Sequence, residues 1–285
     1  MNIFWAFLVL LQAYISAVRV NYGNPDAFEG DIGLDPETRA IINGQLTENQ
    51  FKGVTLDRIW PGAQIPYVFD NNFDNRRRQL VNQAITSYNQ HTCVRFAPRT
   101  NQRDFVHMVN EQGCWSIIGR QGNSQKLKLG DWCLDIGTAI HEMMHAAGFY
   151  HEQSRNDRDD HVVIFWNNIQ RGEDYNFQKY RTEYYGQTYD HNSIMHYRND
   201  EFSANGKNTI QAKNNPGLKL GNNQFSKSDI AAINQMYKCS GVTGITPAPC
   251  EDSHSNCAAW AKANECNKNP NWMRPNCKKS CGTCV

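Results

Sequence analysis

The segment His141-Glu142-Met-Met-His145-Ala-Ala-Gly148-Phe-Tyr-His151 decides the fold and the chemistry of this chain. Two histidines four residues apart on a helix project from one face, so both imidazoles can reach one metal ion. Glu142 lies next to them, close enough to hydrogen-bond a water on that ion. Gly148 can adopt a positive φ, which ends the helix and lets His151 arrive as a third ligand.

Three neutral imidazoles leave one position of a tetrahedral zinc ion open for water, which is the catalytic rather than the structural arrangement. The pattern H-E-x-x-H alone arises by chance in about one chain per hundred of this length and composition. The glycine and the third histidine at fixed offsets make chance a poor explanation. The alternative interpretation is a solvated helix whose histidines are otherwise satisfied.

A second motif, Ser193-Ile-Met195-His-Tyr197, lies downstream of the three histidines. A methionine in a tight turn beneath a three-histidine zinc site is the metzincin pattern. Without the zinc motif, Met195 would be interpreted as ordinary core filler. A phenol at Tyr197 can donate a hydrogen bond to a developing oxyanion, whereas the alternative is a packed tyrosine in a surface turn.

From about Phe28 to Cys239 the chain resembles the astacins, which are secreted zinc endopeptidases of the metzincin group. The resemblance implies an α+β fold with two lobes, in which a twisted sheet and long helices border a zinc cleft. A substrate strand would lie along the edge strand near Cys114–Ser116. The motifs that carry the resemblance are His141–Arg155, Trp60-Pro-Gly, Ile65-Pro-Tyr67, Cys114-Trp-Ser116, Arg158–Val162, Asn176-Phe177 and Ser193–Tyr197.

The resemblance also implies roles for individual residues. His141, His145 and His151 would bind one Zn²⁺ per chain. Glu142 would act as the general base and then donate the proton to the leaving amine. Tyr197 would be a further zinc ligand that swings away and stabilises the oxyanion.

Met195 would lie under the zinc, and Glu152 would receive the new N-terminus of the mature enzyme in the interior. Phe28-Glu-Gly-Asp31 resembles the Phe-x-Gly-Asp motif of astacin pro-segments, whose aspartate binds zinc in place of water. On its own this tetrapeptide would be interpreted as a surface turn. A carboxylate on a glycine turn is nevertheless a plausible zinc ligand, so Asp31 is expected to hold the chain latent.

An apolar run without charges extends from Ile3 to Leu11. It has the length of a signal-peptide core and is too short to span a bilayer. We expect cleavage after Ala17; the alternative is a buried strand or a membrane anchor. Ten cysteines, six of them in the last 36 residues, favour an oxidising compartment, so we expect a secreted, extracellular protein.

Charge and hydropathy exclude other classes of partner. The chain has 29 Lys and Arg against 28 Asp and Glu, a net charge of +1. This balance gives no electrostatic basis for binding nucleic acid or an anionic membrane. After the N-terminal run no segment approaches 18 apolar residues, so no membrane span is expected.

The C-terminal residues 250–284 resemble the ShK-type module, named for a channel-blocking toxin. Toxins of this type use a Lys-Tyr pair, but the aligned positions here are Asn271 and Trp272. The tail is therefore expected to bind an extracellular-matrix or cell-surface partner. Six cysteines allow 15 pairings; the two resemblances together imply Cys93–Cys239, Cys114–Cys133, Cys250–Cys284, Cys257–Cys277 and Cys266–Cys281.

The expected organisation is a signal peptide at 1–17, a pro-segment at 18–52, a zinc peptidase domain at 53–240, a linker at 241–249 and the module at 250–284. Activation would need a cut between about Gln50 and Gly53 by another protease. The expected function is hydrolysis of peptide bonds in protein or peptide substrates. The alternatives are a toxin or binding protein that acts through its tail, and an inactive scaffold.

Substrate preference is expected to differ from that of the astacins that favour an acidic residue after the scissile bond. Those members carry an arginine where this chain has Asn223. A neutral amide offers a weaker bond to a carboxylate than a guanidinium does. Lys213, Lys219 or Arg198 could supply the missing charge from a neighbouring loop.

Local patterns predict the main helices and several strands. Helices are expected over about 76–91, with Asp74 as its cap, and over 136–147. A Ser226-x-x-Asp229 capping box precedes a third helix. Strands are expected at 65–69, 105–109 and 114–118.

Overall fold

The structure is a computed structural model that describes residues 27–33, 58–179 and 185–239. Near the C-terminus it describes residues 252, 254–269, 273, 277 and 279–281. The expected signal peptide, most of the expected pro-segment and the expected linker lie outside the described residues.

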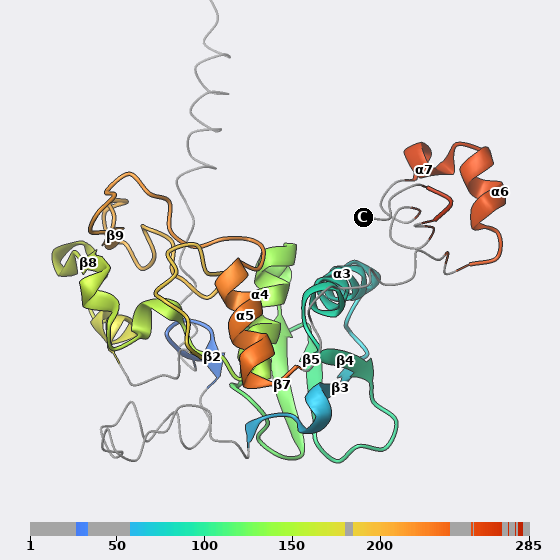
Figure 1. Ribbon diagram of the computed structural model, residues 1–285, viewed down its shortest axis with the longest axis horizontal. Coiled ribbons are helices and arrows are strands. Elements are labelled where there is room, and N and C mark those ends of the chain that lie inside the picture. Colours follow the sequence, from blue (N-terminus) through green and yellow to red (C-terminus); the bar gives the residue numbers. More distant parts are fainter. Residues whose placement is uncertain are drawn as a thin grey trace, which may run out of the picture.

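A seven-stranded mixed sheet forms one lobe (Figure 1). In chain order its strands are β1 (Ala27–Phe28), β2 (Ile32–Gly33), β3 (Gln64–Phe69), β4 (Arg95–Pro98), β5 (Phe105–Val109), β6 (Cys114–Ser116) and β7 (Ser124–Leu129). Across the sheet the order is β1-β2-β6-β7-β5-β3-β4. The strands from β7 to β4 are parallel, whereas β6 runs antiparallel to β7.

Strand β7 shows how the sequence sets the two faces of this sheet. Gln125, Leu127 and Leu129 are buried, while Ser124 and Lys126 are exposed, because successive side chains of a strand point to opposite faces. This strand was not predicted, since its alternating pattern uses polar residues on both sides. Strand β6 ends at Ser116, two residues earlier than expected.

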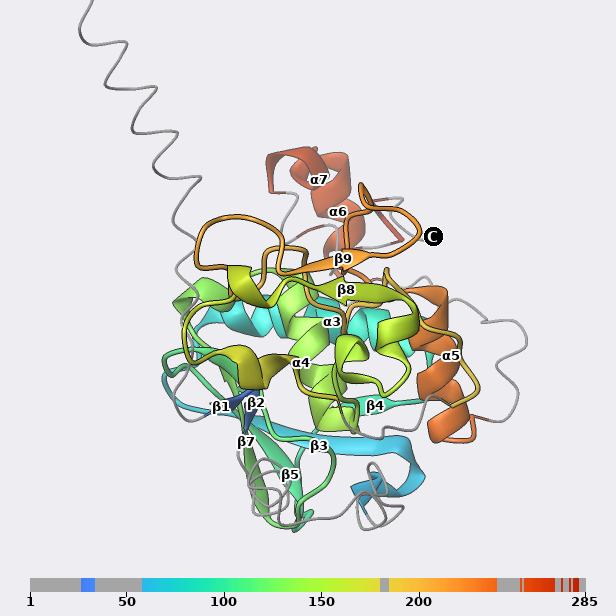
Figure 2. The same cartoon turned by 90° about the vertical axis from the view of Figure 1, so that its left-hand side faces the viewer.

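Two long helices, α3 (Asn75–His91) and α4 (Ile136–Ala147), pack together on one face of the sheet (Figures 1 and 2). Asp74 caps α3, and its carboxylate accepts a hydrogen bond from the Arg77 backbone N–H at 2.9 Å. The buried face of α3 carries Val81, Ala84 and Tyr88. The Tyr88 hydroxyl donates to the Ile140 carbonyl at 3.1 Å, which joins the two helices.

A second, less regular lobe follows α4. Its strands β8 (Val162–Ile164) and β9 (Ile210–Ala212) pair antiparallel. Its core consists of Val162, Ile169, Phe177, Tyr189, Tyr197, Phe202, Ile210, Ala212 and Leu220. Four of the described short 3-10 helices follow α4, at Glu152–Ser154, Arg158–Asp160, Trp166–Asn168 and Asp174–Phe177. Two others, Pro61–Ala63 and Asp131–Cys133, precede α4.

Helix α5 (Lys227–Met236) returns to the main core, where Ile233 and Met236 are buried. Ser226 and Asp229 form the expected capping box. Just beyond α5, the Tyr237 hydroxyl donates to the Ala147 carbonyl at 2.7 Å. Trp60 donates from its indole to the Ala146 carbonyl at 2.8 Å. The last turn of α4 is thus held by residues from both ends of the domain.

Four disulfides are described. Cys93 is bonded to Cys239 and Cys114 to Cys133. In the tail, which contains helices α6 (Cys257–Lys262) and α7 (Glu265–Lys268), the bonds are Cys257–Cys277 and Cys266–Cys281. The fifth expected pair, Cys250–Cys284, lies outside the described residues. No helix within the described ranges combines the length and the apolar character that crossing a bilayer requires.

Replacing both Cys93 and Cys239 by alanine should lower the free energy of unfolding by about 4–5 kcal/mol. The bond joins residues 146 positions apart, so its loss returns a large loop-closure entropy to the unfolded chain. Thermal unfolding in non-reducing buffer measures the effect. The double variant C257A/C277A is the control and should leave the main transition in place; an unchanged melting temperature for C93A/C239A would contradict the prediction.

Candidate metal centre and active site

Helix α4 presents His141 and His145 on one face, one turn apart. Asp135 starts the helix, because its carboxylate accepts a hydrogen bond from the Thr138 backbone N–H at 3.0 Å. Gly148 ends it with φ 116°, and its N–H bonds back to the carbonyls of Met144 and His145. The turn at this glycine carries the chain to His151.

One metal-binding group of side chains occurs in the described ranges, formed by Asp31, His141, His145 and His151. One ligand atom from each lies within 4.8 Å of the others. The Nε2 atoms of His141 and His151 are 3.2 Å apart. Asp31 reaches all three rings with its two carboxylate oxygens: Oδ2 lies 3.2 Å from His141 Nε2, and Oδ1 lies 3.2 Å from His151 Nε2 and 3.6 Å from His145 Nε2. Three nitrogens and one oxygen are a donor set that suits zinc.

The hydrogen bonds at the Nδ1 atoms of His141 and His145 show whether their Nε2 atoms are available to a metal ion. His141 Nδ1 lies 2.7 Å from the Ile194 carbonyl oxygen, and His145 Nδ1 lies 2.7 Å from that of Phe149. A carbonyl only accepts, so each Nδ1 carries the proton and each Nε2 is left with its lone pair. His145 Nε2 and Asp31 Oδ1 are buried with no hydrogen-bond partner. A cation between them would satisfy both atoms.

Burial lowers the pKa of His145 to about 4. At neutral pH its imidazole is therefore unprotonated, as a metal ligand has to be. His151 behaves differently. Burial acts to lower its pKa, but the carboxylates of Asp31 and Glu29 raise it to about 10. Metal binding at His151 would therefore release a proton.

Glu142 is 1% exposed and faces the same cleft as His141. Its Oε2 atom is buried without a hydrogen-bond partner in the described structure. Burial, together with the negative charge of Asp31, raises the pKa of its carboxyl well above the usual value. A carboxylate that readily takes up a proton beside a metal site is suited to general-base chemistry.

The turn from Ser193 to Tyr197 lies beside the histidines. Ser193 Oγ and the Ile194 N–H both donate to Asp229 of α5, at 2.6 and 2.9 Å. Met195 is 2% exposed and lines a pocket together with His151. Because the Ile194 carbonyl accepts from His141, Asp229 supports a metal ligand through one peptide unit.

Tyr197 packs its ring against His151, with 5.0 Å between ring centroids. Its backbone N–H donates to Gln153 Oε1 at 3.0 Å, and its hydroxyl donates to the Glu29 carbonyl at 2.8 Å. The phenol thus reaches the site, and here it is bonded to the segment that contains Asp31.

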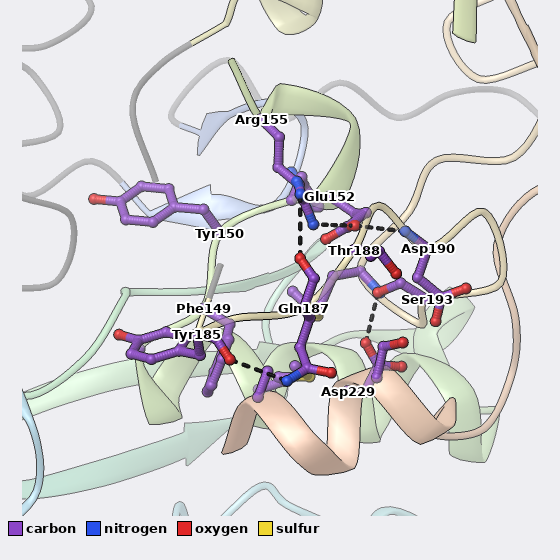
Figure 3. A pocket seen from close by; sticks show the side chains of 16 residues that line it. Phe149, Tyr150, Glu152, Arg155, Tyr185, Gln187, Thr188, Asp190, Ser193 and Asp229 are labelled. Carbon is purple, nitrogen blue, oxygen red and sulfur yellow. Dashed lines mark hydrogen bonds and ion pairs between the residues drawn. The ribbon is translucent and has the colours of Figure 1, made fainter. Parts of the chain in front are cut away.

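Glu152 lines a pocket of about 60 Å³ (Figure 3). Its Oε1 accepts from Arg155 at 2.9 Å and from the Asp190 N–H at 2.8 Å. Burial raises the pKa of its carboxyl to about 7, although Arg155 opposes the shift. Asp229 lines the same pocket.

Residues 27–33 occupy the sheet edge where a substrate strand was expected. β2 pairs in parallel with β6, and the Ser116 N–H donates to the Asp31 carbonyl at 2.9 Å. Two glycines allow this close approach. A Cβ on Gly33 would meet the Trp115 ring at 2.6 Å, and one on Gly30 would meet Phe202 at 2.9 Å.

Sequence reasoning missed Glu29, the variable position of the Phe-x-Gly-Asp motif. Its side chain is 1% exposed. One carboxylate oxygen lies 2.7 Å from His151 Nδ1, and the other accepts from Ser154 Oγ. Only the tertiary structure shows these contacts, because more than 120 residues separate the partners.

The cleft beside His141 and Glu142 has a volume of about 310 Å³ and is lined from both lobes. Gly137, one helical turn before His141, packs against Asn223: a Cβ there would meet the Asn223 Cα at 2.8 Å. Arg198 donates to Asn223 Oδ1 at 3.0 Å. Of the three basic residues considered from sequence, Arg198 is the one that lines this cleft.

Comparison with known proteins places these features in a family. Residues 53–238, more than half of the chain, match the model described as Astacin, a peptidase family. The chain belongs to the astacin family. Residues 249–284 match the ShK domain-like model, so an astacin domain is followed by an ShK-like domain.

Individual astacins extend the comparison. Zinc metalloproteinase nas-15 of Caenorhabditis elegans is 35% identical over 311 residues, which cover 91% of this chain and 54% of that protein. High choriolytic enzyme 1 of Oryzias latipes is 41% identical over 233 residues, covering 74% and 86%. Nas-13 of Caenorhabditis elegans is covered over 53% of its length, so the chain spans about half of some of these relatives.

A solved structure of high choriolytic enzyme 1, a hatching enzyme zinc-protease from Oryzias latipes, superposes with a TM-score of 0.61 at 39% sequence identity. It covers 64% of this chain and 93% of that one. The expected astacin fold, with a mixed sheet plus helices and a cysteine-rich tail, is confirmed. The expected zinc cofactor is likewise confirmed by the family and by the Asp and His cluster.

Replacing Asp229 by asparagine should weaken zinc binding by roughly tenfold, because the Ile194 peptide that orients His141 loses a charged acceptor. Competition with a chromophoric chelator measures the dissociation constant. S226A is the control: it removes a cap of α5 and leaves the bonds from Asp229 to Ser193 and Ile194. Equal affinities for D229N and S226A would contradict the supporting role of Asp229.

Proposed function

We propose that this chain is a secreted, latent, zinc-dependent endopeptidase that hydrolyses peptide bonds in proteins or peptides. The observation that carries the proposal is the convergence of three imidazole Nε2 atoms beside the buried Glu142 carboxyl. Zinc bound by His141, His145 and His151 would lower the pKa of a water molecule and polarise the substrate carbonyl.

The side chains around this centre divide the remaining work. Glu142 takes the proton of the attacking water and passes it to the leaving amine, because a carboxyl with a raised pKa can hold a proton between the two steps. Tyr197 lies beside His151, and its phenol donates a hydrogen bond to the oxyanion of the substrate. Met195, which lines a pocket together with His151, would lie under the zinc.

A substrate strand binds along β6 once residues 27–33 have left. The backbone groups of Cys114–Ser116 are then free to pair with a peptide, which is the usual way an exposed sheet edge binds an extended chain. The cleft of about 310 Å³ beyond His141 accommodates a substrate side chain.

Latency rests on Asp31, whose carboxylate lies among the three Nε2 atoms. In this position it would act as the fourth zinc ligand and take the place of the attacking water. An activating protease cuts between about Gln50 and Gly53. The new N-terminus then enters the pocket beside Glu152 and pairs with its carboxylate.

Export to the extracellular space is inferred from the apolar run at Ile3–Leu11 and from cysteine use. The described cysteines are all in disulfides, which persist in oxidising compartments. The boundaries of the pro-segment and the linker lie outside the described residues.

The ShK-like tail supports a second candidate function, binding of an extracellular-matrix or cell-surface partner. If this binding were the main activity, the tail alone would reproduce the effect of the whole protein. Assays of the catalytic domain and the tail, each prepared separately, distinguish the two functions.

Glu142→Gln should abolish peptide hydrolysis while zinc stays bound. The amide cannot accept the proton of water, and the loss should reach about 10³-fold or more in kcat. The test compares hydrolysis of a quenched fluorescent peptide and zinc content by atomic absorption. Near-normal turnover by E142Q would refute the mechanism.

Asp31→Asn should make the uncut protein active. A neutral amide is a poor zinc ligand, so the water position becomes available before the pro-segment is cut. Peptide hydrolysis by uncut D31N should exceed that of the uncut parent by about tenfold or more. Identical background activities would exclude Asp31 as the group responsible for latency.

Arg198→Ala should reduce cleavage before acidic residues by roughly tenfold relative to cleavage before alanine. The guanidinium held by Asn223 can form a charge-assisted hydrogen bond with a substrate carboxylate. This prediction revises the expectation from Asn223 alone, because the structure adds Arg198 to the cleft. K219A removes an exposed charge outside the cleft and serves as control; unchanged selectivity of R198A would disprove the assignment.

A further inference from the structure

Both carboxylate oxygens of Glu29 are hydrogen-bonded. The Phe-x-Gly-Asp motif, in which Glu29 is the variable position, assigns this residue no role. Oε2 lies 2.7 Å from His151 Nδ1, and Oε1 accepts the hydroxyl proton of Ser154. The Glu29, His151 and Ser154 side chains are each 1% exposed or less. A buried carboxylate is costly unless it is fully hydrogen-bonded, and this one is.

The backbone at Glu29 is also unusual. Its φ is +52°, in the left-handed region that side chains other than glycine seldom adopt. Such a conformation persists when the surrounding contacts determine it. Here the carboxylate holds one side of the residue, and the Glu29 carbonyl accepts from the Tyr197 hydroxyl at 2.8 Å on the other.

Glu29 and Asp31 contact His151 on opposite ring nitrogens. An Asp31 oxygen lies 3.2 Å from Nε2, the atom that faces the metal site. Glu29 bonds to Nδ1, on the far side of the ring. Glu29 therefore does not compete with a metal ion, and its contacts can hold the segment in the cleft while Asp31 acts at the metal site.

We propose that Glu29 is a second anchor of the latent state, which fixes the pro-segment to His151 and Ser154 and keeps the Tyr197 hydroxyl engaged. The proposal deepens the latency described above and rests on that proposed function. Activation then does two things: it frees the metal site from Asp31, and it releases the Tyr197 phenol from the Glu29 backbone.

The test uses the full-length, uncut chain with four single substitutions. E29A removes both carboxylate contacts. E29Q keeps hydrogen bonds to His151 and Ser154 without the charge. S154A deletes the only described side-chain partner of the second oxygen. I32V trims packing of the same segment without touching Glu29 and serves as the matched control.

Two readouts are measured for each variant: background hydrolysis of a quenched fluorescent peptide, and hydrogen exchange of the amides of residues 29–33. A hydrogen bond to a charged group contributes enough to change an equilibrium by about tenfold to a hundredfold. E29A should raise both quantities by about that factor. E29Q and S154A should give smaller increases, and I32V should stay near the parent.

After the pro-segment is cut off, the E29A, E29Q and I32V proteins yield the same chain as the parent. Equal kcat/KM values for these activated enzymes show that the catalytic domain has folded and that any difference arose in the latent state. Ser154 remains in the activated enzyme, and S154A should match the parent there because its partner has left.

The outcomes separate this inference from the proposed latency. If E29A and S154A match I32V in both readouts while D31N is active uncut, the second anchor is refuted and latency by Asp31 stands. If uncut D31N stays inactive while uncut E29A hydrolyses the peptide, the role of Asp31 in latency is refuted and Glu29 is the principal anchor.

Discussion

The orientation of three imidazole rings is the constraint on which the rest of this structure depends. Each ring has its Nδ1 atom bonded to a fixed oxygen: a carbonyl of the 193–197 turn, a carbonyl after Gly148, and the Glu29 carboxylate. These bonds turn the Nε2 atoms towards one point. The end of α4 at Gly148 and the 193–197 turn, which Asp229 holds, place the two carbonyls that His141 and His145 need.

Two of the oxygens belong to the astacin domain, and one belongs to residues 27–33, which the proposed function assigns to a pro-segment. In the proposed activation, His141 and His145 would keep their partners, whereas His151 would lose the Glu29 carboxylate. Residues 27–33 also pair with the edge of β6, and Gly30 lies against Phe202 in the second lobe. In the proposed latent state, residues 27–33 would inhibit through three contacts: Asp31 at the metal site, β2 along β6, and Glu29 on His151 and Ser154.

Local sequence patterns could predict the centre of the site because its geometry is helical. The spacing of His141 and His145, the break at Gly148 and the capping residues Asp74 and Ser226 act over one or two turns. The family resemblance implied some contacts between distant segments, such as Cys93–Cys239, but contacts outside the family's motifs could not be predicted. Glu29 meets His151, and Arg198 meets Asn223, only after the lobes have folded. Strand β7 escaped prediction because its polar residues concealed the alternation.

The Cys93–Cys239 bond connects a residue just beyond α3 to a residue just beyond α5. All three zinc-binding histidines lie between these two cysteines in the chain. A single cut by another protease in any intervening loop would therefore leave both fragments covalently joined. Because the disulfide joins the two fragments, a nicked molecule would run as one species on a denaturing gel until a reductant is added.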